Sequence, residues 1–108
     1  MKLIFKLFYT SLLFVSILNA NENVDCIILE DENSIICKYS NERYNQDRNV
    51  TFNWHEPNGN LSRQREITIP SGHGSVYDFR YIKGRVPGQW TLKVNDNNQT
   101  FKTNFIIE

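Results

Sequence analysis

The chain lacks the features that mark several classes of protein. It has 12 basic and 12 acidic residues, and after residue 20 the balance is 10 basic to 12 acidic, a net charge of −2. It therefore has no electrostatic footprint for a nucleic acid or an anionic membrane. It has no internal repeat, no long low-complexity stretch and almost no apolar pattern of helical period after residue 20. Its longest apolar run is shorter than the ~20 residues that a membrane span needs. These absences leave one small domain built from strands.

The first twenty residues have the order of a secretory signal. Lys2 and Lys6 form a short positive region, an apolar run follows over residues 7–18, and Ala20 is a small residue at the expected cleavage point. An uncleaved anchor is the alternative, but the polar stretch 21–23 favours cleavage. We therefore predict a signal peptide helix over residues 1–20 and a single mature domain over residues 21–108. The mature protein would be exported through the Sec route, periplasmic or secreted, with no stable membrane span.

Only two cysteines are present, and both follow the predicted signal. An even pair in an exported protein favours a disulfide between Cys26 and Cys37. A redox motif would need two intervening residues rather than this longer spacing. A zinc site would need two further ligands, and only His55 and His73 are available. Pairing the cysteines also centres a hairpin on the polar residues 30–33, so the turn and the disulfide predict one strand register.

Apolar and polar residues alternate with a period of two through most of the mature region. Turn-forming residues, such as Pro57 and Gly59, separate the alternating segments at regular spacing. This pattern predicts an all-β fold, an immunoglobulin-like antiparallel β-sandwich of about seven strands. The expected strands cover residues 24–29, 34–39, 50–55, 61–69, 75–82, 90–94 and 101–107.

The alternation also predicts which side chains are buried. The centre of the core is expected to come from Val50, Phe52, Trp54, Trp90, Leu92 and Val94. In the segment 75–82, Tyr77, Phe79 and Tyr81 share one face. We expect that face to be buried, because alternating aromatic residues in a strand usually face a core. A surface strip that binds a partner is the alternative.

Basic residues concentrate in the middle of the mature chain. If strands 61–69 and 75–82 pair, Arg63, Arg65 and Arg80 share an exposed face. That face would be either a patch for an acidic partner or polyanionic glycan, or a solvated surface balanced by Glu66 and Asp78. We favour the solvated surface.

Residues 50–107 resemble the immunoglobulin-like modules of bacterial envelope proteins, including macroglobulin-type domains. The residues that carry the resemblance are Trp54, Glu56-Pro57-Asn58-Gly59, Tyr77-Asp78-Phe79, Gly88-Gln89-Trp90-Thr91-Leu92-Lys93-Val94 and Phe105-Ile106-Ile107. They cover about two thirds of the mature chain. The resemblance implies a fold and a compartment and no reaction; such modules need no disulfide hairpin, so Cys26 and Cys37 are a departure from it.

Three triplets match the N-glycosylation acceptor, at Asn49, Asn60 and Asn98. An aspartate lies two positions before Asn49 and before Asn98, as in the extended acceptor of bacterial systems. We therefore predict that Asn49 and Asn98 are candidate glycosylation sites and that Asn60 is skipped. Chance matches are the alternative, because asparagine is abundant in this chain.

No constellation of residues indicates catalysis. The loop Ser71-Gly72-His73-Gly74-Ser75 brings serine near histidine, but no acid or oxyanion hole accompanies it. His55 and His73 have no metal-ligand spacing. We therefore expect a protein that is not an enzyme, with no catalytic or metal site and no cofactor. The prediction is an exported, periplasmic protein-interaction or scaffold module that binds another envelope protein; the alternative is a small periplasmic protein that binds a metal or a glycan.

Overall fold

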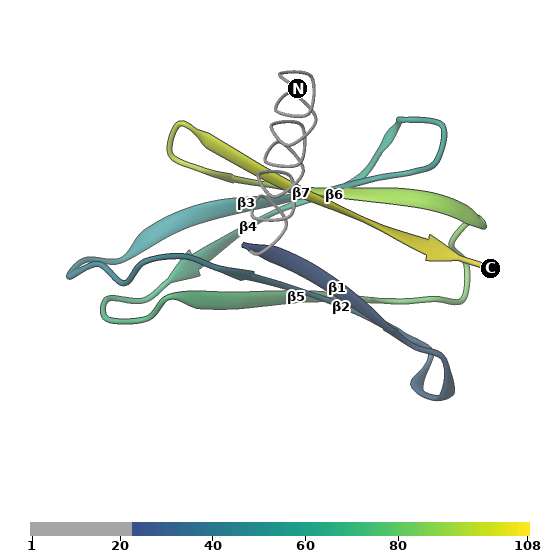
Figure 1. Ribbon diagram of the computed structural model, residues 1–108, viewed down its shortest axis with the longest axis horizontal. Helices are drawn as coiled ribbons and strands as arrows, with labels where there is room; N and C mark the ends of the chain where they lie inside the picture. The colour runs from purple at the N-terminus through teal and green to yellow at the C-terminus, as the bar shows by residue number, and fades with distance from the viewer. Residues whose placement is uncertain (1–22) are drawn as a thin grey trace, which may run out of the picture.

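The computed structural model describes residues 23–108, which form two antiparallel β-sheets facing each other (Figure 1). The signal peptide predicted over residues 1–20 lies outside the described residues. Within the described part of the chain, no helix is long and apolar enough to cross a membrane. The elements are β1 (Val24–Leu29), the 3-10 turn η1 (Glu30–Glu32), β2 (Ser34–Ser40), β3 (Arg48–His55), β4 (Leu61–Ile69), β5 (Ser75–Tyr81), β6 (Gly88–Asp96) and β7 (Gln99–Ile107).

The strands form a three-stranded sheet of order β1-β2-β5 and a four-stranded sheet of order β4-β3-β6-β7. The prediction of an all-β, immunoglobulin-like sandwich of seven strands is confirmed. In the constant-type immunoglobulin domain the fourth strand lies in the sheet of the fifth. Here β4 pairs with β3 instead. The strands 61–69 and 75–82, whose pairing was considered from the sequence alone, therefore lie in different sheets.

A tight turn explains why β4 folds back onto β3. The Gly59 amide donates a hydrogen bond to the Glu56 carbonyl at 2.8 Å, with Pro57 at the second position of the turn. Gly59 has a φ of +94°, which a residue with a side chain rarely adopts. This short connection joins neighbouring antiparallel strands and leaves β5 to cross to the other sheet.

The β1–β2 hairpin has the predicted register. Cys26 lies directly opposite Cys37, and the two form a disulfide. Asn33 ends η1 in the left-handed conformation, which asparagine tolerates better than most residues. The Cys37 side chain faces the interior, and its exposed fraction is 0%. The disulfide therefore joins an edge strand to the centre of the three-stranded sheet.

The predicted core is confirmed on the inner face of the four-stranded sheet. Val50, Phe52 and Trp54 are buried on β3, and the Trp54 ring meets the Phe105 ring edge-on with 5.8 Å between centroids. The rest of that sheet's core is Trp90, Leu92, Val94, Ile69 and Ile107. The three-stranded sheet contributes fewer residues: Val24, Ile35, Cys37, Tyr39 and Val76.

The expected burial of Tyr77, Phe79 and Tyr81 is wrong. Phe79 is 46% exposed and the two tyrosines are 58% exposed. Asp78 lies opposite the buried Cys37, so its neighbours Tyr77 and Phe79 must point outward. The inner face of β5 therefore carries Val76, Asp78 and Arg80. Two of these three inward-facing residues are charged.

Candidate functional site

The outer face of the three-stranded sheet carries a continuous apolar surface. Ile27, Ile36 and Phe79 lie opposite one another across β1, β2 and β5. Tyr77 and Tyr81 flank this row on β5, and Phe79 meets Tyr81 in a T-shaped arrangement with 5.4 Å between ring centroids. We call these five side chains the aromatic face.

Exposure of large hydrophobic side chains is concentrated on this face. Eight such side chains are exposed in residues 23–108, and four of them belong to it. The other four are scattered over loops and other strands: Tyr44, Leu61, Val86 and Ile106. Scattered exposed apolar residues are ordinary on a soluble protein, whereas a contiguous patch marks a place of contact.

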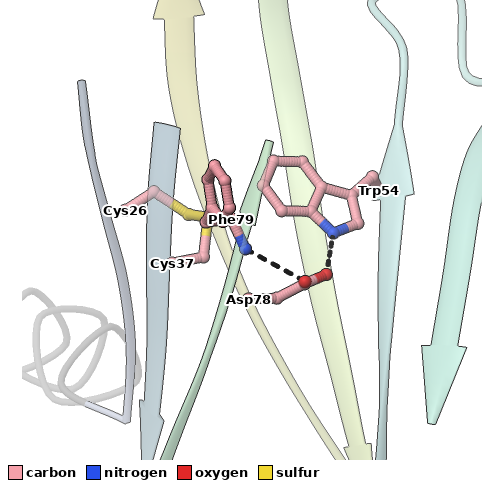
Figure 2. Close-up of a disulfide and its surroundings, with 5 residues drawn as sticks. All are labelled: Cys26, Cys37, Trp54, Asp78 and Phe79. Atoms are coloured by element: carbon pink, nitrogen blue, oxygen red, sulfur yellow. Dashed lines mark hydrogen bonds between the residues drawn. A yellow bond between two sulfur atoms is a disulfide. The ribbon is translucent and has the colours of Figure 1, made fainter. Parts of the chain in front are cut away.

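Asp78 lies buried on the opposite side of β5 from the aromatic face (Figure 2). Its Oδ2 accepts a hydrogen bond from the Trp54 indole at 2.8 Å, and its Oδ1 accepts one from the Phe79 amide at 3.0 Å. Since Trp54 belongs to β3, this carboxylate connects the two sheets. The interaction satisfies a buried indole N–H that would otherwise have no acceptor in the apolar core.

Two arginines of β4 complete the surroundings of Asp78. Arg65 donates to Asp78 Oδ1 at 2.8 Å, and Arg63 donates to the same oxygen at 3.3 Å. Arg63 lies opposite Trp54 in the sheet, so it projects from the inner face of β4. The expected shared outer face is therefore corrected: Arg63 and Arg65 project from the inner face of β4 and Arg80 from the inner face of β5. The side chains of Arg63 and Arg65 stay 32% and 52% exposed, and Asp78 balances their charge as expected.

These side chains line a shallow cavity where β4 and β5 face each other. Its walls are Arg63, Arg65, Phe79, Arg80, Tyr81 and Arg85, and its volume is about 330 Å³. We call it the arginine pocket. Phe79 and Tyr81 belong both to this pocket and to the aromatic face, so the two surfaces are continuous.

Arg80 occupies the inner wall of the arginine pocket. Its guanidinium lies over the Trp54 ring, 5.4 Å from the centroid, and donates a hydrogen bond to the Ser62 hydroxyl at 3.1 Å. Burial, followed by the positive charges of Arg85 and Arg63, lowers the pKa of Arg80 below its ordinary value. The neighbouring arginines of the pocket are therefore close enough to disfavour a further positive charge at Arg80, although burial is the larger cause.

A second buried carboxylate connects the sheets elsewhere. Asp96 of β6 accepts a hydrogen bond from the Tyr39 hydroxyl of β2 at 2.6 Å and pairs with Arg48 at 3.4 Å. Burial raises the pKa of Tyr39 well above its ordinary value of 10.0, and the hydrogen bond to Asp96 raises it further. Because an ionised Tyr39 would face the Asp96 carboxylate without water, the folded protein strongly favours the neutral phenol.

This arrangement predicts a loss of stability in alkali. Above about pH 10 the unfolded chain releases the Tyr39 proton while the folded protein keeps it, so unfolding becomes easier as the pH rises. Between pH 9 and 11 the free energy of unfolding should fall by about 1.4 kcal/mol in total more than in the Tyr39→Phe variant, with most of the loss above pH 10. Urea unfolding between pH 9 and 11 measures the difference, with the exposed Tyr81→Phe as control. Equal slopes in wild type and Tyr39→Phe would contradict the assignment.

The histidines and the serine loop lie apart from both surfaces. The His55 ring approaches the Gly59 carbonyl at 3.3 Å, and His73 is exposed in the loop before β5. The Ser75 hydroxyl is hydrogen-bonded to that of Ser40 at 3.0 Å. Among residues 23–108, no group of three or more His, Cys, Asp or Glu side chains is placed to hold a metal ion.

Both candidate glycosylation sites are exposed. Asn98 lies in the two-residue turn between β6 and β7, and Asn49 lies near the start of β3, where its side chain accepts a hydrogen bond from Thr68 at 2.7 Å. The β6–β7 turn is at the opposite end of the sandwich from the β3–β4 turn (Figure 1). The arginine pocket is lined by Arg63 and Arg65, which follow the β3–β4 turn in the sequence. Glycosylation of Asn49 and Asn98 stays a prediction.

Comparison with known proteins gives no match from which a function could be inferred. No protein-family model matches this chain, and no curated protein is significantly similar to it in sequence.

Proposed function

We propose that this chain is a non-catalytic, exported protein-interaction module of the cell envelope, and that the aromatic face is its docking surface. One observation carries the proposal: a contiguous row of apolar side chains faces solvent on a sheet whose other side already packs on the core. Such a patch lowers the free energy of a complex by removing apolar surface from water.

The hairpin geometry makes the aromatic face a suitable docking surface. Ile27 and Ile36 belong to the two strands that the Cys26–Cys37 disulfide joins, and Phe79 lies on the strand hydrogen-bonded to β2. Their relative positions are therefore fixed before a partner arrives. A preformed surface loses little conformational entropy on binding, and exposed tyrosine and phenylalanine side chains are enriched at such interfaces.

Export belongs to the same proposal. The lysine-flanked apolar segment 1–20 and the cysteine pair fit an oxidising compartment outside the cytoplasm. The likeness of residues 50–107 to macroglobulin-type envelope modules points to the same place, and the two acid-flanked sequons favour a bacterial periplasm. The partner in this proposal is another envelope protein.

Photo-crosslinking in the native host tests the docking surface directly. Benzoylphenylalanine placed at position 79 should yield one defined crosslinked product, because this side chain is 46% exposed and lies between Tyr77 and Tyr81 on the aromatic face. The matched control places the same group at position 106 on β7, where Ile106 is 58% exposed but isolated from the face. That position should yield no such product.

The Tyr77→Ser/Phe79→Ser double variant provides a second arm. After general chemical crosslinking in the native host, the double variant should no longer be recovered with the partner. The Ile106→Ser variant should still be recovered with it. Both changes lie on exposed side chains, so the melting temperature should change little. A product of equal yield at positions 79 and 106, or none at position 79, would contradict the proposal.

A further inference from the structure

The arginine pocket holds more positive charge than its surroundings neutralise. Four arginines line it, and within residues 23–108 the carboxylate that forms ion pairs with them is Asp78, which contacts Arg63 and Arg65. Glu56 has a weaker effect on Arg80. The Asp78 side chain has no exposed surface, so it cannot be approached from solvent. The face that the pocket presents to a partner is therefore cationic.

Few of the N–H donors of these arginines bond to other groups of the described protein. Each guanidinium has five N–H donors. Arg63 and Arg65 share one oxygen of Asp78, and Arg80 donates to Ser62. Arg85 Nε is buried and has no hydrogen-bond partner among residues 23–108. A buried charged donor without an acceptor is costly, and an oxyanion entering the pocket would supply that acceptor.

The walls of the pocket select among oxyanions. Phe79 and Tyr81 contribute aromatic surface to the lining, and four arginines contribute the rest. A carboxylate on a short apolar stem fits both, because its methylene groups contact the rings while its oxygens meet the planar forks of arginine. The side chain of glutamate or aspartate has this construction.

We propose that the arginine pocket binds a glutamate or aspartate side chain presented by an acidic, apolar segment of the partner that covers the aromatic face. The inference rests on the proposed function and deepens it by stating the chemistry of the partner. Continuity of the two surfaces through Phe79 and Tyr81 supports it, because a segment lying on the face passes over the pocket. Charge complementarity would then fix the orientation of the partner on an otherwise apolar surface.

NMR titration of the purified exported protein provides the test. The probe is the peptide acetyl-Leu-Glu-Glu-Leu-amide, and its neutral control is acetyl-Leu-Gln-Gln-Leu-amide. The side-chain Nε–H signals of Arg80 and Arg85 should shift with the glutamate peptide and not with the glutamine peptide. Arg48, which pairs with Asp96 away from the pocket, is the internal control and should not shift. Absence of a shift at Arg80 and Arg85, or an equal shift at Arg48, would overturn the inference.

Charge variants give a second measurement. Arg80→Gln and Arg85→Gln should each weaken binding of the glutamate peptide about tenfold, the effect expected when one charge-assisted contact is lost. Lys93→Gln and Lys102→Gln remove the same charge from paired positions on the four-stranded sheet and should leave binding unchanged. Circular dichroism checks the folding of each variant, and the wild-type titration decides the question if a pocket variant does not fold.

Two further comparisons are needed. One distinguishes an acidic partner from other anionic ligands, and the other distinguishes failure of this inference from failure of the proposed function. If trigalacturonate or inorganic phosphate displaces the glutamate peptide at lower concentration than the peptide binds, a glycan or phosphoryl ligand replaces the acidic partner and the inference fails. If position 79 crosslinks but neither peptide binds, the proposed function stands and the inference fails. Peptide binding without a crosslink at position 79 would overturn the proposed function instead.

Discussion

Replacement of Asp78 by alanine should lower the free energy of unfolding by about 1–3 kcal/mol, the range for leaving a buried donor without its acceptor. The side chain accepts hydrogen bonds from Trp54, Arg63 and Arg65. Without it, the Trp54 indole N–H is left without an acceptor in the core, and the arginines repel one another without compensation. The loss is therefore larger than that of any single hydrogen bond.

Urea unfolding followed by tryptophan fluorescence measures this effect. Asp25→Ala, on the exposed outer face of β1, is the matched control and should change stability by less than about 0.5 kcal/mol. Asp78→Asn keeps an acceptor for the indole but removes the charge, so its loss should fall between those of the other two variants. A loss below about 1 kcal/mol for Asp78→Ala would mean that the carboxylate does not connect the sheets.

Removal of the disulfide should cost about 3 kcal/mol, the loop-entropy estimate for cysteines 11 positions apart. The Cys26→Ala/Cys37→Ala variant tests this, because alanine creates no buried hydroxyl at the fully buried position 37. For a domain of this size such a loss is a large share of the total stability. The aromatic face should loosen with it, since Ile27 and Ile36 neighbour the joined residues.

The wild-type protein provides the control for the disulfide. Reductant should lower its unfolding midpoint toward that of the double variant and should leave the variant unchanged. An identical midpoint for oxidised wild type and variant would show that the hairpin turn alone fixes the register.

The strands and most of the core were predictable from the sequence because each depends on local pattern. Period-two alternation placed Phe52, Trp54 and Leu92 in the core, and all three are fully buried. The bounds of β1 and β4 agree with the prediction, whereas β6 extends beyond 90–94 to Gly88–Asp96. The added residues are polar or glycine, and their pairing with β7 comes from the sheet rather than from their own pattern.

The candidate site was not predictable because it depends on which face of β5 turns inward. Alternation gives two faces and cannot say which is buried when one carries aromatic residues and the other carries Val76, Asp78 and Arg80. The choice is made by contacts with other strands: Trp54 needs an acceptor, and Arg63 and Arg65 of β4 neutralise the acid that provides it. One unusual signal in the sequence was Asp78 between the aromatic residues Tyr77 and Phe79. It indicates which face of β5 is buried only once the sheet order places Asp78 opposite Cys37.

The inward charges on β4 and β5 also affect how copies of this protein behave toward one another. Both are edge strands, whose free backbone groups invite another strand to pair. Arg63 and Arg65 project from one edge strand toward Asp78 and Arg80 of the other. A foreign strand that extended either sheet would have to cover these charges without water. The side of the sandwich that carries the arginine pocket is thereby protected against edge-to-edge polymerisation, which matters for a protein that also exposes an apolar face.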